Sequence, residues 1–326
     1  MKRILFLSKS ESASSTRYRA LQFMPLLTQA GFEVAHANVS GNAGTAFLRT
    51  LVKAARADIV VVLRKTLPGP LLWLLRSASR RLVFDFDDAI FCNTDGSGSP
   101  TRMRRFAAML GACDHVFAGN SFLASKTTPF NPRVTVLPTC VDPERYQVVA
   151  EKSQNSLDLV WIGSASTKKY LLAVLPALRL AAARVPGLRL KIIADFDLPD
   201  AGFPVLAVPW NAATEARELA SAHIGIAPMR DDQWSRGKCA LKILQYMAAG
   251  LPVISSAAGA NAEVVEAGRS GYLVAGDAEW CERIAELASD EDLRARMGDA
   301  GREKLMAAYS LAPVSSRMRS VFDQLS

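Results

Sequence analysis

Short apolar runs alternate with amphipathic segments along the first half of this chain. The apolar runs predict strands, and the segments between them predict helices with one buried face. The expected strands cover residues 3–7, 33–38, 58–63, 81–86, 115–118 and 134–137. The expected helices cover residues 16–30, with a kink at Pro25, and residues 45–57, 68–79 and 101–112. Strand and helix in alternation indicate an α/β fold with a doubly wound parallel sheet.

The same alternation starts again after a polar linker at residues 150–158. Further strands are expected at residues 159–163, 188–194, 205–208, 224–227, 253–255 and 271–274, and helices at 278–289 and 292–308. We therefore predict two Rossmann-like domains, residues 1–150 and 157–310, with a ligand held where the strands of both sheets end. Val314, Met318, Val321 and Leu325 form an apolar stripe on a final helix.

The stretch from Pro228 to Val274 has the clearest local signals. Ser235, Gly237 and Lys238 open a predicted helix that stops at Gly250. The unpaired N–H groups at such a helix start suit a phosphate, and Lys238 and Lys242, one turn apart, add positive charge. After the next strand, residues 259–263 make a predicted turn with a carboxylate at the strand's carboxyl end.

Composition narrows the class of protein. The chain has 326 residues, half of them hydrophobic, which suits a folded globular protein with two domains of roughly 150 residues each. No apolar run approaches the ~20 residues that cross a bilayer, and residues 1–7 are too short for a signal peptide. Five scattered cysteines without CxxC spacing, and only three histidines, make a zinc site and a disulfide framework poor predictions. We expect a reduced, cytoplasmic protein.

The net charge of +8 favours an anionic partner. Nucleotide phosphates and an anionic membrane surface both fit, whereas nucleic acid is the poorest candidate because no nucleic-acid motif is present. The alternative is a solvated positive face without a partner.

Residues 245–253 read Gln-Tyr-Met-Ala-Ala-Gly-Leu-Pro-Val. This run resembles the donor-binding segment of family 4 glycosyltransferases, retaining enzymes with the GT-B fold, whose pattern is Glu, seven residues, Glu-Ala-Met-Ala-x-Gly-x-Pro-Val, then Gly-Gly-x-x-Glu. Two positions depart from it: the first Glu falls on Gly237 and the second on Gln245. Gln245 can still bond ribose hydroxyls, but Gly237 offers no side chain to a donor sugar. The resemblance also implies that residues 311–326 cross back to the first domain.

The resemblance implies further donor contacts in the second domain. Gly163 and Lys169 match a turn whose cations hold the donor diphosphate, while Ser164 replaces its Arg. Hydroxyls at a helix start can still bind phosphate, and plain helix capping by Ser166 or Thr167 is the alternative. Trp210 lies where the family seats the nucleotide base, although packing is the commoner role. Gly259 and Glu263 match the last turn and the carboxylate near the donor sugar.

The fourth strand ends in a cluster of acids, Asp85, Asp87 and Asp88, whose repulsion must be offset by cations, hydrogen bonds or a raised pKa. In the resembling family, Asp87 falls on a His and Asp88 on an Asp that face acceptor and donor, so we predict Asp87 as the group that orients the acceptor hydroxyl or donor sugar. A Mg²⁺ site is one alternative, although the family needs no metal, and helix capping is another. Arg17 and Arg19, at the end of the first strand, are candidates for anion binding or simply exposed arginines. Asn120 matches a family turn on the acceptor side.

The function predicted from this resemblance is retaining transfer of a sugar from a nucleoside diphosphate sugar to a hydroxyl. The acceptor is expected to be a sugar or a lipid-linked sugar of bacterial surface polysaccharide or glycolipid, reached at the inner face of the cytoplasmic membrane, and no cofactor is expected. Three rivals stay open. They are a GT-B nucleotide-sugar epimerase, a non-catalytic partner subunit that explains the departures at Ser164, Gly237 and Gln245, and a dinucleotide-dependent enzyme, disfavoured because no GxGxxG follows a strand.

Overall fold

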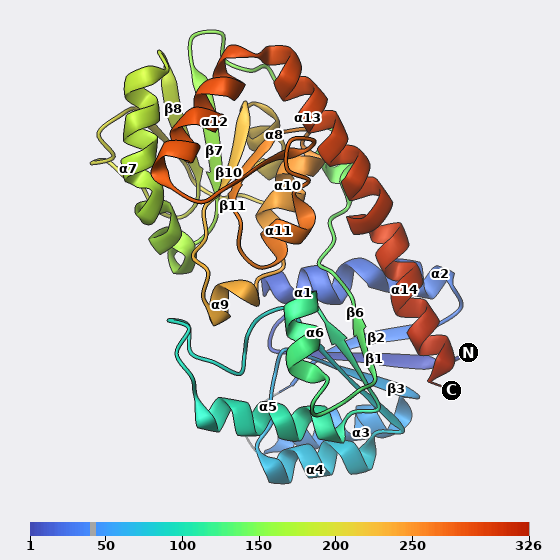
Figure 1. The fold of residues 1–326 in the computed structure, drawn as a ribbon. Coiled ribbons are helices and arrows are strands. Elements are labelled where there is room, and N and C mark those ends of the chain that lie inside the picture. The colour runs from blue at the N-terminus through green and yellow to red at the C-terminus, as the bar shows by residue number, and fades with distance from the viewer. Residues whose placement is uncertain (40–43, 326) are drawn as a thin grey trace. The chain divides into compact units, whose positions relative to one another are not determined.

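A computed structural model describes residues 1–39 and 44–325 of the chain. The chain forms two compact units, which are coloured along the sequence in Figure 1. The first unit consists of Met1–Cys140, Asp232–Cys239 and Leu311–Ser326, and the second of Val141–Asp231 and Ala240–Ser310. A segment of eight residues from the middle of the C-terminal half, Asp232–Cys239, therefore belongs to the first unit.

The first unit is built on a six-stranded sheet in the order β2-β1-β3-β4-β5-β6, and all its neighbouring strands are parallel. The strands are β1 Arg3–Ser8, β2 Glu33–Asn38, β3 Ile59–Leu63, β4 Arg81–Phe86, β5 His115–Ala118 and β6 Val134–Val136. The helices are α1 Ser14–Arg19, η1 Leu21–Phe23, α2 Met24–Gln29, α3 Thr45–Arg56, α4 Gly69–Ala78, α5 Pro100–Ala112, α6 Ser121–Thr127, α9 Gln233–Arg236 and α14 Leu311–Gln324.

Helices cover both faces of this sheet, because successive side chains of a strand point to opposite faces. Leu5 and Leu7 of β1 pack into a core shared with α3, α4 and α5. Ile4 and Phe6 point the other way, into a core that α2 and α14 complete. From α14, Phe322 packs edge-on against Phe6, with ring centroids 6.5 Å apart. In Figure 1 this helix is the red segment that runs beside the sheet to the chain's C-terminus.

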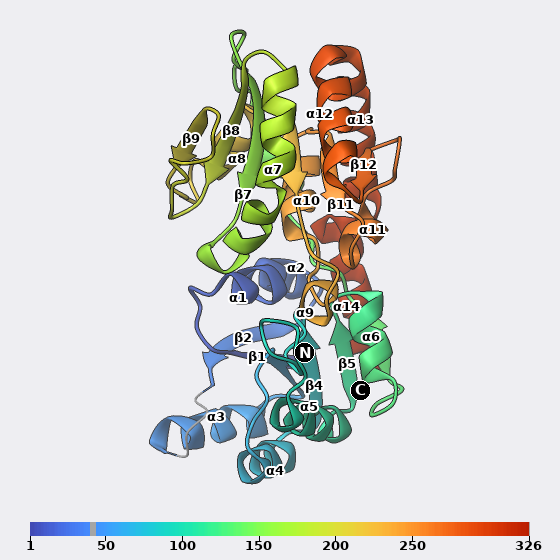
Figure 2. The same cartoon turned by 60° about the vertical axis from the view of Figure 1, so that its left-hand side comes forward.

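The second unit repeats the architecture with a six-stranded sheet in the order β12-β11-β10-β7-β8-β9, also parallel throughout. Its strands are β7 Leu157–Ile162, β8 Leu188–Ile193, β9 Val205–Val208, β10 Ile224–Ala227, β11 Val253–Ser256 and β12 Gly271–Val274. Its helices are η2 Pro143–Tyr146, η3 Ala165–Thr167, α7 Lys168–Arg184, α8 Glu215–Ala220, α10 Leu241–Ala248, α11 Ala260–Val264, α12 Asp277–Ser289, α13 Glu291–Lys304 and the π-helical turn Leu305–Tyr309. Helix α7 packs against α12, and α10 against α13 (Figure 2). The predicted α/β class with two doubly wound parallel sheets is confirmed.

Three local predictions were wrong. The helix expected at residues 16–30 is three pieces, because the chain leaves the helical conformation at Ala20 and Pro25 then occupies the first turn of α2, where its missing N–H costs nothing. The helix expected to open at Ser235 begins only at Leu241, after Ala240 adopts a left-handed backbone with φ of 53°. Residues 260–264, expected in a turn, form the short helix α11.

No helix within the described parts of the chain has both the length and the apolar character that crossing a bilayer requires.

His115, at the start of β5, makes stability depend on pH. Its Nε2 lies 2.9 Å from Thr135 Oγ1, and burial, reinforced by the charge of Arg133, lowers its pKa from 6.5 to about 4. Between pH 6.5 and pH 4, His115 is protonated in the unfolded chain but neutral in the folded chain. The free energy of unfolding therefore falls as the pH falls from 6.5 towards 4. Between pH 7 and pH 5, we expect the free energy of unfolding of His115→Gln to fall by about 1–2 kcal/mol less than that of the unchanged protein. Parallel urea titrations of both proteins would contradict this if their pH profiles coincided.

Candidate functional site

The order of strands in the second unit reverses between β7 and β10. From β7 the chain proceeds to β8 and β9 on one side, and from β10 to β11 and β12 on the other. Connections leave the sheet in opposite directions at such a point, and the crevice beyond the carboxyl ends of the two strands is where open parallel sheets bind ligands. Gly163 and Ser164 follow β7 directly, so the predicted phosphate turn lies at this point.

Lys242 of α10 reaches the same turn. Its Nζ donates to Thr167 Oγ1 over 3.2 Å and lies 3.9 Å from the centroid of a Trp161 ring. Gly163 makes this approach possible, because a Cβ there would come within 2.3 Å of the Trp161 ring and 2.7 Å of Lys242 Nζ. The predicted residues Gly163 and Lys242 are therefore brought together, with an ammonium group beside backbone and hydroxyl donors.

Hydroxyl groups cluster on the turn itself. Ser164 is exposed, its N–H donates to Thr167 Oγ1 over 3.3 Å, and its Oγ lies 2.9 Å from Ser166 Oγ. Lys168 and Lys169 begin α7, a helix of 17 residues. Lys168 Nζ is held 4.5 Å from the centroid of the Phe196 ring, whereas Lys169 lies near Tyr170. This arrangement offers N–H, O–H and ammonium donors to an anion, as a diphosphate requires.

A buried carboxylate, Glu215 of α8, organises two other predicted residues. Its Oε1 accepts from Gln245 Nε2 over 2.8 Å and from the Tyr146 hydroxyl over 2.6 Å. Its Oε2 accepts from Trp210 Nε1 over 2.7 Å. Gln245 is 4% exposed and Glu215 8%. Gln245 thus stands where the family pattern has a Glu. The carboxylate of Glu215, from helix α8, lies within hydrogen-bond distance of it.

Gly259 and Glu263 frame the end of β11. Gly259 has φ of 51°, a backbone conformation that is strained for residues with a side chain, and it leads into α11. Asn261 is buried and donates to Ser255 Oγ over 3.0 Å, which fixes α11 on the strand. Glu263 is exposed in α11, and its carbonyl accepts from Lys304 Nζ over 3.1 Å.

The segment Asp232–Cys239 belongs to the first unit, which places Lys238 differently from the prediction. Asn120 holds it: Nδ2 donates to the carbonyls of Arg236 and Lys238, each over 3.0 Å, while Oδ1 caps α6 at Leu123 N–H. Lys238 does not share a helix with Lys242, since Gly237–Cys239 link α9 to the residue before α10. Asn120, predicted on the acceptor side, is 2% exposed and acts here as a clamp on this segment.

Gly237 has no room for the glutamate that the family pattern puts there. A Cβ would lie 2.6 Å from both the backbone N and the Cβ of Ala89. The backbone of Gly237 is in the ordinary helical region, with φ of −75°, so its steric environment alone excludes a side chain. The departure from the family pattern is therefore a packing requirement of the first unit.

We expect Gly237→Ala to lower the free energy of unfolding by about 1–3 kcal/mol, because the new methyl group overlaps backbone atoms that cannot rotate away. Gly111→Ala is the matched control, because nothing lies within 4 Å of a Cβ at that helical position. Denaturant unfolding of both variants measures the difference. Equal stability of the two variants would show that Ala89 can yield.

The acids at the end of β4 have separate partners. Asp85 is fully buried and accepts from Arg19 Nε over 2.8 Å and Nη2 over 2.9 Å. Arg19 also donates to the Leu137 carbonyl over 2.7 Å. Burial raises the pKa of Asp85 to about 6, although Arg19 opposes the shift. Arg19 is 0% exposed, so the expectation of an exposed arginine was wrong, and its bonds argue against a role in anion binding.

Asp87 and Asp88 meet Arg64, which directly follows β3. Arg64 Nη2 bonds Asp88 Oδ2, and Nε lies 3.3 Å from Asp87 Oδ1. Lys238 Nζ bonds the other oxygen of Asp88 over 2.6 Å and lies 4.4 Å from the Trp234 ring centroid. Both oxygens of Asp88 are therefore occupied. Asp87 Oδ1 has the ion pair but no hydrogen bond within the described structure, so this carboxylate alone of the three has unused hydrogen-bonding capacity.

The structure also bears on Arg17 and on the alternative of a metal site. Arg17 of α1 is half-buried, with its guanidinium 5.6 Å from the Tyr18 ring centroid. Over residues 1–39 and 44–325, no three His, Cys, Asp or Glu side chains are grouped so as to hold a metal ion.

Sequence reasoning missed Arg64, Glu215 and Asn261. Arg64 has a positive φ of 56°, which no sequence pattern reveals, although a charged residue directly after a buried strand was a usable signal. Glu215 lies 30 residues from Gln245, so only the fold brings them together. Asn261 sits inside the segment already singled out, between Gly259 and Glu263, but a buried amide has no local sequence signature.

Comparisons with known proteins bear on this arrangement. Residues 156–290 match the family model described as "Glycosyl transferases group 1". Spore coat protein SA of Bacillus subtilis (strain 168) is 35% identical over 83 residues, which are 24% of this chain and 22% of that protein. The chain thus matches about a fifth of the length of this curated relative.

Solved structures match over nearly the whole chain. HepE of Anabaena, solved with UDP and glucose, has a TM-score of 0.73 at 15% identity and covers 99% of this chain and 100% of its own. A glycosyltransferase from Rickettsia africae ESF-5 reaches 0.78 at 13% identity, covering 99% and 98%. WaaG, a glycosyltransferase involved in lipopolysaccharide biosynthesis, reaches 0.68 at 15% identity, covering 98% and 99%.

At these identities the structural matches establish a shared fold, and the family match covers residues 156–290 of the second unit. Residues 156–290 are therefore similar to the group 1 glycosyltransferases, and the chain has the GT-B fold.

Proposed function

We propose that this protein transfers a sugar from a nucleoside diphosphate sugar to a hydroxyl acceptor with retention of configuration. The observation that carries the proposal is the approach of Lys242 to the hydroxyl turn after β7, at the strand-order reversal of the unit that matches the family. HepE, of the same fold, binds UDP and UDP-glucose, so a UDP sugar is the first donor to try.

The donor diphosphate would lie on the turn formed by residues 163–167. Its oxygens would accept from the N–H and O–H groups there and from Lys169 and Lys242, which also stabilise the charge of the departing diphosphate. Trp210 and Gln245 would hold the nucleoside, and Glu263 the hydroxyls of the sugar. Lys238, predicted at the helix start that faces the phosphate, is bonded to Asp88 in the first unit, so the proposal gives the phosphates to Lys169 and Lys242.

In the proposed reaction the acceptor oxygen bonds to the anomeric carbon while that carbon's bond to the diphosphate oxygen breaks. The acceptor proton passes to the leaving phosphate oxygen. Asp87 would orient the acceptor hydroxyl or the donor sugar. No metal or other cofactor takes part in this proposal, and the nucleotide sugar is a substrate.

We further propose that the acceptor is a sugar or lipid-linked sugar met at an anionic membrane surface. Three side chains of α3 and α4 support this: Leu48 is 60% exposed, Val52 54% and Trp73 68%. Exposed Arg49 and Lys53 lie on α3 with Leu48 and Val52, while Trp73 belongs to α4. Apolar groups beside cations suit an interface with anionic lipids. Surface polysaccharide or glycolipid assembly is the setting that fits best.

The test is turnover with a panel of UDP sugars and sugar acceptors, followed by proton NMR of the new anomeric centre. The expected result is UDP release that depends on the acceptor, with the donor's configuration kept. A GT-B epimerase would instead alter the free nucleotide sugar without an acceptor. An inert partner subunit would bind nucleotide and turn over no donor.

Glu215 gives a sharper prediction about donor binding. We expect Glu215→Gln to raise the donor KM about tenfold with kcat nearly unchanged, because loss of the charged acceptor loosens Gln245 and Trp210. Tyr146→Phe removes one bond to the same carboxylate and a longer one of 3.3 Å from Gln245, but it leaves the charge of Glu215 in place and should change KM much less. Steady-state kinetics of both variants decide it. A fall in kcat alone would place Glu215 in another role.

A further inference from the structure

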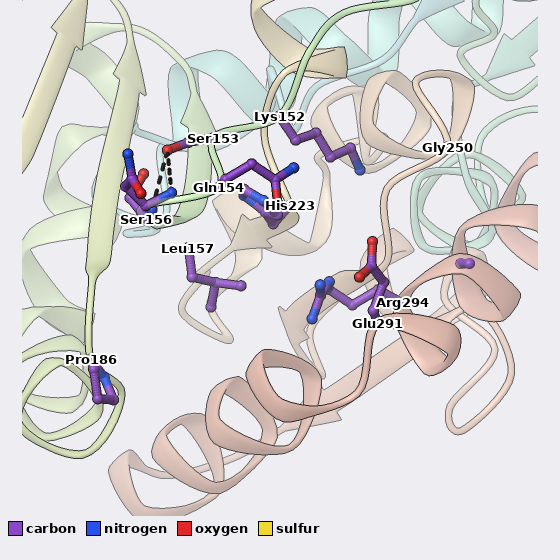
Figure 3. A pocket seen from close by; sticks show the side chains of 12 residues that line it. Lys152, Ser153, Gln154, Ser156, Leu157, Pro186, His223, Gly250, Glu291 and Arg294 are labelled. Atoms are coloured by element: carbon purple, nitrogen blue, oxygen red, sulfur yellow. Dashed lines mark hydrogen bonds between the residues drawn. The ribbon is translucent and has the colours of Figure 1, made fainter.

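A cavity of about 360 Å³ lies in the second unit, at the edge of the sheet opposite the hydroxyl turn. Its lining comes from the residues that precede β7, β8, β10 and β11 and from the first turn of α13. Figure 3 shows Lys152, His223, Glu291 and Arg294 converging on it from three segments of the chain. The proposed donor site uses none of these residues.

Two cations line this cavity without a carboxylate partner. Within the described structure neither Lys152 nor Arg294 makes an ion pair, although Glu291 is near both. Arg294 is fixed in place, since Nη1 donates to the carbonyls of Leu287 and Ala288 over 2.6 and 3.1 Å. Its remaining N–H groups are left for another acceptor.

The surrounding groups sense this positive charge. His223 is 7% exposed, and its pKa is lowered by burial and then by the charge of Lys152. The pKa of Lys152 is lowered by partial desolvation and by Arg294, although the residue is exposed to solvent. Asp158, a buried acid whose charge opposes the shift in the pKa of His223, is engaged by Arg189 through two bonds of 2.8 Å. Glu291 is thus the one carboxylate among the lining residues, which include the cations Lys152 and Arg294.

We propose that this cavity binds a small phosphate-bearing anion, with the phosphate group between Lys152 and Arg294. Two cations converging on a site with net positive charge suit the charge and the several acceptor oxygens of a phosphate. The cavity also has room for more than the phosphate alone, so a phosphate ester of a small metabolite is the expected class. Residues 152–156 of its wall run directly into β7, whose other end carries Gly163, so such a ligand is placed to act as an effector of donor binding.

Calorimetric titration with inorganic phosphate and with glucose 6-phosphate tests this, in the presence of saturating UDP so that the donor turn does not contribute. Saturable binding is expected, weakened about tenfold or more in Lys152→Gln and in Arg294→Gln. Glu291→Gln should strengthen it severalfold, because the opposing charge is removed. Arg296→Gln is the matched control: it removes a cation from the same helix that does not line the cavity.

Loss of a cation should weaken phosphate binding, whereas Glu291→Gln should strengthen it. General damage to the fold would weaken binding in every variant, so the two causes can be distinguished. Arg294→Lys provides a second check if Arg294→Gln unfolds. An absence of saturable binding, or equal affinity in all variants, would overturn the proposal. Phosphate binding that follows these variants in a protein that does not bind UDP would leave this site standing and refute the proposed transferase.

Discussion

Asp87→Asn is expected to lower turnover by about 10²–10⁴-fold while the affinity for UDP stays unchanged. Asp85 is committed to Arg19, and both oxygens of Asp88 are bonded to Arg64 and Lys238. Asp87 alone of the three keeps an oxygen without a hydrogen bond in the described structure. It is also the position that the family resemblance aligns with a residue facing the substrates. Single-turnover rates and UDP titrations measure the two effects separately.

Asp88→Asn is the informative contrast. This change weakens both ion pairs and leaves Arg64 and Lys238 without their shared anion, so it should lower the free energy of unfolding by about 1–3 kcal/mol. Asp87→Asn should change stability much less. If Asp87→Asn retained full turnover, the carboxylate would have no part in the reaction, and the cluster would be structural as a whole.

Lys169→Gln is expected to weaken UDP binding about 10- to 100-fold, through loss of a charged contact to the diphosphate. The adjacent Lys168→Gln is the matched control. Both lysines are in the first turn of α7 and change the net charge equally, but Lys168 is held over the Phe196 ring. A long-range effect of charge would therefore weaken both variants alike, and a direct contact only Lys169→Gln.

Binding of UDP to the two variants can be followed by calorimetry at two salt concentrations, because a direct, partly desolvated contact is screened less than a distant charge. Equal affinities for Lys168→Gln and Lys169→Gln would move the diphosphate away from the start of α7. Lys242 would then be the remaining cation at the turn, and Lys242→Gln the next variant to measure.

Most of the fold could be predicted from the sequence because it depends on local pattern. Runs such as residues 59–63 are buried on both faces of the sheet, and each is followed by a helix with one apolar face. Most of the expected elements differ only at their edges, whereas residues 16–30 form three helical pieces and residues 260–264 a helix instead of a turn. Where the prediction of a helix failed, at Ala240, the cause is a left-handed residue that nothing in its type announces.

The candidate site was predictable only in part. Gly163 and Lys242 meet as expected, because one ends a strand and the other lies on the helix that follows the neighbouring strand. Lys238 could not be placed, because its position depends on Asn120, more than a hundred residues away, capturing the backbone of Asp232–Cys239. From the sequence alone, Gly237 in place of a glutamate suggests a lost function. In the structure, Ala89 leaves no room for a side chain at this position.

The most direct test of the central claim is the thermal stability of the purified protein with UDP, UDP sugars and nicotinamide cofactors. A ligand at about 100 times its dissociation constant should stabilise the folded state by about 2.7 kcal/mol. We predict this shift with one UDP sugar and with UDP, and its loss in Lys169→Gln. No shift with any nucleotide or nucleotide sugar, or a shift with a nicotinamide cofactor alone, would contradict the account.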